Sequence, residues 1–352
     1  MKIYADQAIL ALDYYFAGQG ELKTFDPHTV QAQDLRDADI LLVRSTLAVN
    51  AGLLSAASRL QWLGSCVTGV DHLDQAYLSS RRIPYYAAQG CNAAAVAEYV
   101  LSCIAALQSE AKLPKIGRAG VIGAGRVGGR VANLLKQLGY DVLTCDPLRQ
   151  TDPNFTHTPL EQFHDLDLIC VHTPLTKMGS FPTQNLLDRS FLQRQKPGCV
   201  LLNAGRGEVI HEADLWQYGR HLIWCLDVFG HEPNIDSRIV NQAFIATPHI
   251  AGHTVEAKIR GTHMVYQAAA QYFNWTETPI QVKLISWDAP DGNWQQQVLA
   301  YADPRHVTRR FKQGLTDSQD FAKTFTEMRK MYLRHEFGFV SGLQGILSIG
   351  SD

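Results

Sequence analysis

Three residues in the second half of the chain, Arg206, Glu232 and His249, each follow a short apolar run that is typical of a buried strand. An arginine at a strand end can bind a carboxylate through two parallel hydrogen bonds and polarise an adjacent carbonyl. Histidine exchanges a proton near neutral pH, and Pro233 biases Glu232 toward an extended backbone. Each residue also has a structural interpretation, as a loop arginine, a solvated acid or a packed histidine. Their occurrence at successive strand ends favours catalysis, because ligands bind at that edge of an open α/β sheet.

A glycine-rich segment, Gly123-Ala124-Gly125-Arg126-Val127-Gly128, matches the dinucleotide-binding pattern G-x-G-x-x-G. The pattern alone is weak, because any glycine-rich turn can match it. Here it directly follows the apolar run 119–122 and opens a helix predicted over 126–138. Gly123 then permits the tight turn, Gly125 admits the pyrophosphate to the helix N-terminus, and Gly128 allows close packing of helix and strand.

Asp146 ends the next apolar run, about 20 residues beyond the glycines, where the dinucleotide pattern requires an acid. Its carboxylate can accept hydrogen bonds from the ribose hydroxyls and would repel a 2′-phosphate. The sequence therefore predicts NAD as the cofactor, in preference to NADP. Arg149 could soften that preference or could simply be a solvated loop residue.

Short apolar runs alternate with helical patterns along the chain, as expected for an α/β doubly wound architecture. Several runs are apolar almost throughout, which is typical of parallel strands buried on both faces. Besides the helix over 126–138, a helix is predicted after Asn92, with Pro114 beyond its end. The predicted strands are Ile40–Val43, Trp62–Cys66, Ala119–Ile122, Val142–Cys145, Leu168–Val171, Val200–Asn203, Leu222–Leu226 and Phe244–Thr247.

Composition excludes several classes of protein. The 352 residues are 46% hydrophobic and 19% charged with a net charge of −2, which does not favour a nucleic acid or an anionic membrane as partner. No apolar stretch approaches the roughly 20 residues that a membrane helix needs, and no secretory signal is expected. The seven scattered cysteines are expected to be buried thiols of a cytoplasmic protein, with no metal site.

The composition changes after about residue 275, and the last seventy or so residues are predicted to form a small separate unit. Phe321, Phe325, Met328 and Tyr332 fall on one helical face there. A unit of this size cannot bury that face by itself, so we expect a homodimer. The alternative is that the face packs against its own subunit.

Together these motifs resemble the D-isomer-specific 2-hydroxyacid dehydrogenases, from about residue 35 to residue 275. Besides GAGRVG and Asp146, the resemblance rests on four segments, which are the HTP at 172–174, the AGRG at 204–207, the LDVFGHEP at 226–233 and the PHIAG at 248–252. It implies a Rossmann-type NAD-binding domain over 93–253. It also implies a flavodoxin-like substrate domain from 1–92 and 254–280, and a small α+β dimerisation domain over 281–352.

The resemblance also implies roles for single residues. His249 would accept the substrate proton, Glu232 would be its partner, and Arg206 would clamp the substrate carboxylate. The further residues that match cofactor-contacting positions, or lie beside them, are Thr173, Ala204, Gly205, Asp227 and Gly252.

Within this family the chain most resembles the branch that oxidises 4-phospho-D-erythronate to 2-oxo-3-hydroxy-4-phosphobutanoate in the formation of pyridoxal 5′-phosphate. Arg44 and Ser45, which follow the run 40–43, are the candidates for binding its phosphate. Val67 and His253 stand at substrate-binding positions where that branch has other residues. Two alternatives stay open, namely another dehydrogenase of the family, of the phosphoglycerate or hydroxypyruvate type, and a non-catalytic NAD-sensing protein.

Overall fold

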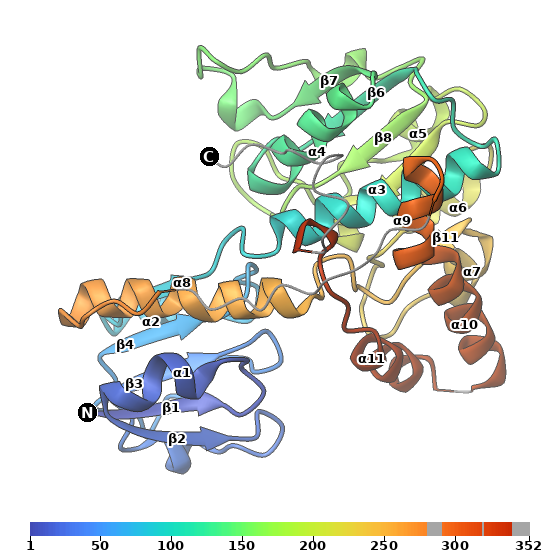
Figure 1. Cartoon of the computed structure of the whole chain (residues 1–352). Helices are drawn as coiled ribbons and strands as arrows, with labels where there is room; N and C mark the ends of the chain where they lie inside the picture. The colour runs from blue at the N-terminus through green and yellow to red at the C-terminus, as the bar shows by residue number, and fades with distance from the viewer. Residues whose placement is uncertain (280–290, 319, 340–352) are drawn as a thin grey trace. The chain divides into compact units, whose positions relative to one another are not determined.

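The computed structural model describes residues 1–279, 291–318 and 320–339. They form two compact units, each built on a parallel sheet (Figure 1). Of the described residues, the first unit contains Met1–Asn92 and 254–279, and the second contains Ala93–His253, 291–318 and 320–339. Two parallel-sheet units confirm the predicted α/β class.

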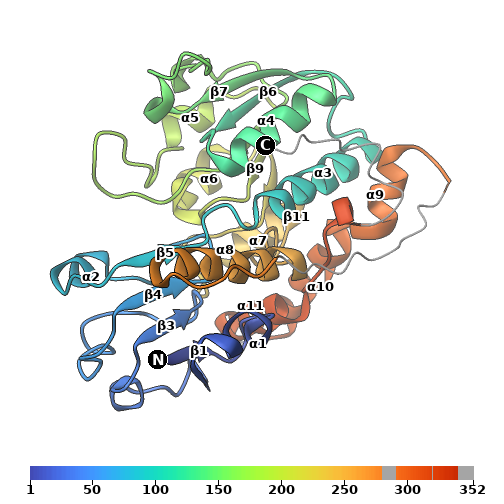
Figure 2. The same cartoon turned by 60° about the vertical axis from the view of Figure 1, so that its left-hand side comes forward.

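The first unit has the strand order β2-β1-β3-β4-β5, which is the flavodoxin-like order 2-1-3-4-5. One face of the sheet is covered by α8, whose Val265 and Tyr266 are fully buried against it (Figure 2). Gly64 permits this packing, since a Cβ there would lie 2.4 Å from a Val265 methyl. The elements are β1 (Lys2–Asp6), α1 (Leu12–Phe16), β2 (Glu21–Phe25), β3 (Ile40–Val43), β4 (Trp62–Ser65), α2 (Gln75–Ser80), β5 (Tyr85–Ala87) and α8 (Val255–Phe273).

The second unit has six parallel strands in the order β7-β6-β8-β9-β10-β11. Numbered within this sheet the order is 2-1-3-4-5-6, so the direction of winding reverses between β6 and β8, where ligands bind in such sheets. The elements are α3 (Ala93–Ser109), β6 (Arg118–Ile122), α4 (Arg126–Gln137), β7 (Asp141–Cys145), β8 (Leu168–Val171), α5 (Arg189–Gln193), β9 (Val200–Asn203), α6 (Glu212–Tyr218), β10 (Ile223–Leu226), α7 (Ser237–Gln242) and β11 (Ile245–Ala246).

Alternate residues of the central strands enter different cores, which explains their continuous apolar sequence. In β8, Leu168 and Cys170 pack with α3 and α4, whereas Ile169 and Val171 pack with α5, α6 and α7. All eight predicted strands are present, with ends shifted by at most one residue. The prediction missed β1, β2 and β5, because β1 interleaves polar residues with apolar ones and the other two are exposed edge strands, which tolerate polar residues.

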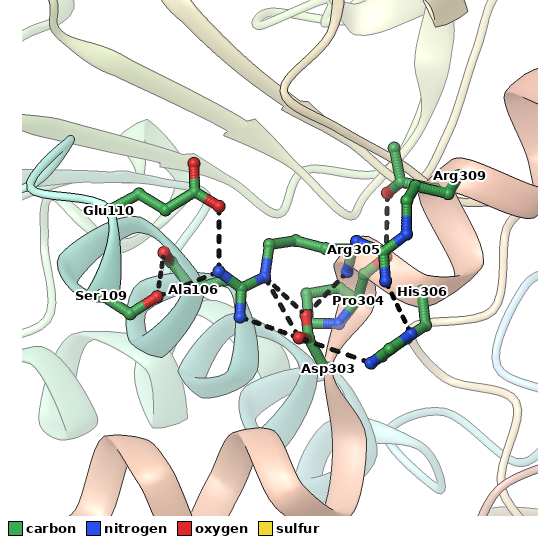
Figure 3. A network of polar contacts seen from close by, with 9 residues as sticks. Ala106, Ser109, Glu110, Asp303, Pro304, Arg305, His306 and Arg309 are labelled. Carbon is green, nitrogen blue, oxygen red and sulfur yellow. Dashed lines mark hydrogen bonds and ion pairs between the residues drawn. The ribbon is translucent and has the colours of Figure 1, made fainter.

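The described C-terminal residues form the helices α9 (Trp294–Ala302), α10 (Pro304–Asp317) and α11 (Phe321–Met331), where a mixed unit of helices and strands was expected. Asn293, Asp303 and Asp320 cap these helices through hydrogen bonds to backbone N–H groups, which favours the helical conformation. Figure 3 shows how α10 is anchored to the end of α3, where Arg305 bonds both Asp303 and Glu110.

The apolar face of α11 is covered by its own chain. Phe325 is 3% exposed and lies edge-on to Phe229, with ring centroids 6.5 Å apart, and it also contacts Phe311. Phe321 and Met328 pack against the same core. The argument that this face needs a second subunit is therefore wrong, and a dimer requires other support.

Candidate active site

The loops after neighbouring strands of the second unit carry the predicted cofactor and catalytic residues along one edge of the sheet. Gly123 follows β6 and Thr173 follows β8. Arg206, Glu232 and His249 then follow β9, β10 and β11, which are adjacent in that order. Because all six strands are parallel, these loops lie at the same edge, which we call the catalytic edge.

His249 and Glu232 form a hydrogen-bonded pair at the catalytic edge. The Nδ1 atom of His249 lies 2.7 Å from Oε2 of Glu232, and the N–H of Phe229 donates to Oε1 at 2.9 Å. Burial alone would raise the pKa of Glu232, but the nearby His249 and these hydrogen bonds lower it below its usual value. Glu232 is therefore an anion at neutral pH, which keeps the proton of neutral His249 on Nδ1 and directs the lone pair to Nε2.

Asp227, at the end of β10, holds the loop that carries His249. Its buried carboxylate accepts hydrogen bonds from the hydroxyl of Thr247 and from the backbone N–H groups of Ile250 and Ala251, at 2.7 to 2.8 Å. Burial nevertheless raises its pKa to about 6. His249 itself has a φ of 56°, a left-handed conformation that is uncommon outside glycine and that this set of bonds maintains.

The loop that carries Arg206 is held by its neighbours on both sides. The buried side chain of Asn203 accepts from the N–H of Gly205 and donates to the carbonyl of Arg206, both at 3.0 Å. A Cβ at Gly205 would lie 3.0 Å from the Thr173 carbonyl oxygen, and one at Gly207 only 2.0 Å from that of Phe229. Small residues are thus required where this loop passes between the loops after β8 and β10.

The glycine-rich segment has the geometry that its pattern predicts. Gly123 has a φ of +84°, and a Cβ at Gly128 would lie 1.8 Å from the Gly123 carbonyl oxygen. A Cβ at Gly125 would meet no atom within 4 Å, so the space before the N-terminus of α4 is open on that side. Asp146 follows β7 and accepts from the N–H of Ala124 at 2.9 Å, which joins the acid to the glycine-rich turn.

The substrate-binding candidates fall in different units. Arg44, Ser45 and Val67 follow β3 and β4 in the first unit, whereas His253 lies in the second. Arg44 is bound side-on by the fully buried Asp6, through Nε at 2.9 Å and Nη2 at 3.0 Å. The Nδ1 atom of His253 donates to the carbonyl of Tyr332 at 3.1 Å, when the proton is on that nitrogen.

The comparisons with known proteins agree with this geometry. A family model described as "D-isomer specific 2-hydroxyacid dehydrogenase, NAD binding domain" matches residues 105–251. The erythronate-4-phosphate dehydrogenase of Coxiella burnetii (strain RSA 331) is 38% identical over 350 residues, covering 97% of this chain and 94% of that protein. The enzyme of the same name from Pseudomonas aeruginosa PAO1 is 37% identical over 353 residues, or 94% of this chain and 92% of that protein.

The chain belongs to the erythronate-4-phosphate dehydrogenase family. Among solved structures, NAD⁺-bound 3-phosphoglycerate dehydrogenase of Entamoeba histolytica matches with a TM-score of 0.65 and 24% identity, covering 80% of this chain and 98% of that one. That likeness establishes the shared fold. The protein is therefore an NAD-dependent dehydrogenase, as the sequence predicted.

The residues present fit the cofactor that this family uses. The hydroxyl of Thr173 is buried without a hydrogen-bond partner within the described ranges, beside the turn at Gly123. An unsatisfied buried hydroxyl is costly, so a ligand that bonds it is favoured there. Gly123, Gly125, Arg126, Val127, Gly128 and Asp146 would then hold the pyrophosphate and adenosine ribose, and Thr173 would lie on the nicotinamide side. Cofactor contacts by Ala204, Gly205, Asp227 and Gly252 stay a prediction.

Several residues that hold the catalytic loops in place through hydrogen bonds were not predicted from the sequence. The hydroxyl of Tyr99, in α3, lies 2.7 Å from that of Thr247, which in turn donates to Asp227. Glu212 accepts from the N–H of Gly230 at 2.7 Å and so braces the loop before Glu232. Among the supporting residues, Asn203 and Thr247 carried a signal in the sequence, because each is a polar residue at the end of an apolar run.

The described helices include none that is long and apolar enough to cross a membrane. All seven cysteines of the chain are buried. The part of the chain that the structure describes holds no cluster of three or more residues suited to a metal ion.

Proposed function

We propose that the protein oxidises the C2 hydroxyl of 4-phospho-D-erythronate to give 2-oxo-3-hydroxy-4-phosphobutanoate, with NAD⁺ as the oxidant, in the formation of pyridoxal 5′-phosphate. The observation that carries the chemistry is the 2.7 Å pair of His249 and Glu232 on the same sheet edge as Arg206 and the glycine-rich turn. The substrate follows from the name of relatives that match the chain over nearly all of its length.

Arg206 binds the substrate carboxylate and so orients C2. The lone pair on Nε2 of His249 accepts the proton of the C2 hydroxyl as the C2 hydrogen leaves with its electron pair. NAD⁺, when bound, supplies the acceptor for that hydride. Two electrons and one hydrogen nucleus thus pass to the cofactor, one proton passes to His249, and the C2–O bond becomes a carbonyl.

Glu232 acts on this step through His249. Its anionic carboxylate holds Nδ1–H and stabilises the imidazolium that forms when Nε2 takes the proton. The lowered pKa of Glu232 preserves this charge through the neutral range. The oxidation therefore needs neutral His249, and the reverse reaction needs the protonated form.

A substrate panel tests the proposal directly. Purified protein is mixed with NAD⁺ and 4-phosphoerythronate, 3-phosphoglycerate or D-lactate, and NADH fluorescence is followed. We expect kcat/KM to be highest with 4-phosphoerythronate. A preference for 3-phosphoglycerate would assign the chain to another activity of the family, and NADH binding without turnover of any acid would indicate an NAD-sensing protein.

We further propose that the enzyme works in the cytoplasm as a homodimer. The buried free thiols suit a reducing compartment. Met331, the last residue of α11, and Leu333 beyond it are 66% and 41% exposed, and exposed apolar side chains suit a subunit contact. Light scattering during size-exclusion chromatography measures the mass, and a monomer at micromolar concentration would reject the dimer.

A further inference from the structure

The segment from Tyr332 to Gly338 connects two of the places at which the chain passes from one unit to the other. These passages follow Asn92 and His253. The Nη2 atom of Arg334 donates to the carbonyl of Ala95, near the first passage, and to that of Ala251, near the second, at 2.5 and 2.8 Å. One guanidinium thus ties the start of α3 to the loop that follows His249.

The same segment also bonds His253. The backbone N–H of Arg334 donates to the carbonyl of His253 at 3.3 Å, and the carbonyl of Tyr332 accepts from Nδ1 of that histidine. A carbonyl can only accept, so this contact places the proton of neutral His253 on Nδ1. The orientation of a substrate-binding candidate is therefore set by the C-terminal segment.

Glu98 anchors this segment to α3. Its buried carboxylate accepts from the backbone N–H groups of Phe337 and Gly338, both at 2.8 Å, and lies 3.7 Å from Nη1 of Arg334. Phe337 is fully buried against residues of α3, including Leu101. Burial raises the pKa of Glu98 to about 7, against the opposing effect of Arg334.

The loop that carries His249, residues 249–253, is called the catalytic loop here, and two contacts hold it from different sides. Asp227 fixes the N–H groups of Ile250 and Ala251, and Arg334 fixes the carbonyl of Ala251. If either contact is lost, the loop can rotate about the other. A displacement of about 1 Å at a reacting group can cost about 10²-fold in rate.

We propose that Arg334 is a positioning residue for the dehydrogenase reaction, which holds the loop of His249 directly and fixes the segment whose Tyr332 carbonyl orients the ring of His253. The inference rests on the proposed function of that loop. It gives the C-terminal segment a role in the reaction that is separate from subunit assembly.

Arg334→Met is the first test, and Arg305→Met is the matched control. Both remove an arginine that joins the C-terminal residues to α3, but the bonds of Arg305 go to Asp303 and Glu110 and not to the loop that carries His249. We expect Arg334→Met to lower kcat by tenfold or more while the Kd for NADH stays within about threefold. Arg305→Met should lower thermal stability and leave kcat unchanged.

Arg334→Lys should restore part of kcat, because one ammonium can donate to both carbonyls but lacks the planar geometry of the guanidinium. If Arg334→Met folds poorly, Glu98→Gln weakens the same anchor without loss of volume and should lower kcat in the same direction. Unchanged kcat in both variants, or a fall that matches the unfolded fraction alone, would overturn the role of Arg334.

Failure of the role proposed for Arg334 can be distinguished from failure of the proposed function. The kcat ratios are measured with whichever 2-hydroxy acid the wild type oxidises fastest. If it oxidises none, the proposed function fails, and the ring resonance of His249 in protein labelled with ¹³C-histidine reports its position instead. That resonance should move in Arg334→Met and not in Arg305→Met, and the reverse pattern would reject the inference.

Discussion

The two parallel sheets both place charged residues at their carboxyl edges, but the acids at these edges act in opposite ways. In the second unit, Glu232 binds one nitrogen of His249 and so directs the other nitrogen to act as a base. In the first unit, Asp6 takes two donors of Arg44 and neutralises its charge. The same edge of the same kind of sheet therefore gives a reactive pair in one unit and an ion pair in the other.

The difference between the two pairs follows from which nitrogen atoms of His249 and Arg44 stay free to bind a ligand. An imidazole bonded at Nδ1 still presents its second nitrogen, whereas a guanidinium bonded through Nε and Nη2 still presents three hydrogens, two on Nη1 and one on Nη2. Arg44 can therefore still donate to a phosphate, held in orientation by Asp6, but with less net charge than an isolated arginine. Its phosphate-binding role stays a prediction that needs a test separating orientation from charge.

The largest effect is expected at the reactive pair. His249→Ala should lower kcat by roughly 10²–10⁴-fold, because the proton of the C2 hydroxyl loses its acceptor. Steady-state kinetics measures kcat, and the Kd for NADH should stay near the wild-type value. Glu232→Gln should give a smaller loss and shift the pH profile of kcat, since the imidazolium loses a charged partner. Turnover at the wild-type rate without His249 would remove it from the mechanism.

The ion pair of Asp6 and Arg44 is tested by measuring both the free energy of unfolding and the KM for 4-phosphoerythronate. Arg44→Gln should cost about 3–5 kcal/mol of unfolding free energy, because Asp6 is left as a buried unpaired charge. Denaturant titration measures this cost, and the double variant Asp6→Asn/Arg44→Gln should recover most of it.

The recovered double variant then isolates binding. Its KM for 4-phosphoerythronate should rise while activity on an unphosphorylated 2-hydroxy acid changes little. Equal losses on both substrates would show that Arg44 is structural and that the phosphate binds elsewhere.

A smaller effect is expected for Asp227, the acid that supports the catalytic loop. Its folded pKa of about 6 lies above the ordinary value of 3.8, so the native state binds the extra proton between these values. The stabilisation from this group is therefore complete below about pH 4 and is lost as the pH rises through about 6.

We expect the difference in unfolding free energy between wild type and Asp227→Asn to fall by up to about 3 kcal/mol over this range. Urea titrations at pH 4, 5, 6 and 7 measure it. A difference that stays constant or grows with pH would mean that Asp227 keeps an ordinary or a lowered pKa.

The smallest effect is expected at Asp146, which follows the edge strand β7. Asp146→Ser should narrow the preference for NAD⁺ over NADP⁺ roughly fivefold, since repulsion between two charges in water is worth about 1 kcal/mol at 4 Å. The ratio of kcat/KM values for the two cofactors measures this preference. Equal efficiency of the wild type with both cofactors would contradict the role of Asp146.

The parts of the site that the sequence predicted are each indicated by residues that lie close together in the chain. The glycine-rich turn needs particular residues at fixed offsets, and Gly123, with its φ of +84°, shows why. The loops of Arg206, Glu232 and His249 follow adjacent strands, so parallel pairing alone brings those loops to one edge. The apolar face of α11 was visible too, but no pattern could tell whether Phe325 would contact a second subunit or Phe229.

What the sequence determined by itself is the α/β class, the dinucleotide site and the catalytic candidates, because strand periodicity and glycine spacing act over a few residues. Tertiary structure alone decided the pairings of buried charges. Asp6 lies 38 residues from Arg44, and Ala251 lies 83 residues from Arg334. The residues near each arginine in the sequence therefore do not indicate which residue it binds. The cost of burying a charge requires that a partner exists, but only the packing of distant segments determines which residue it is.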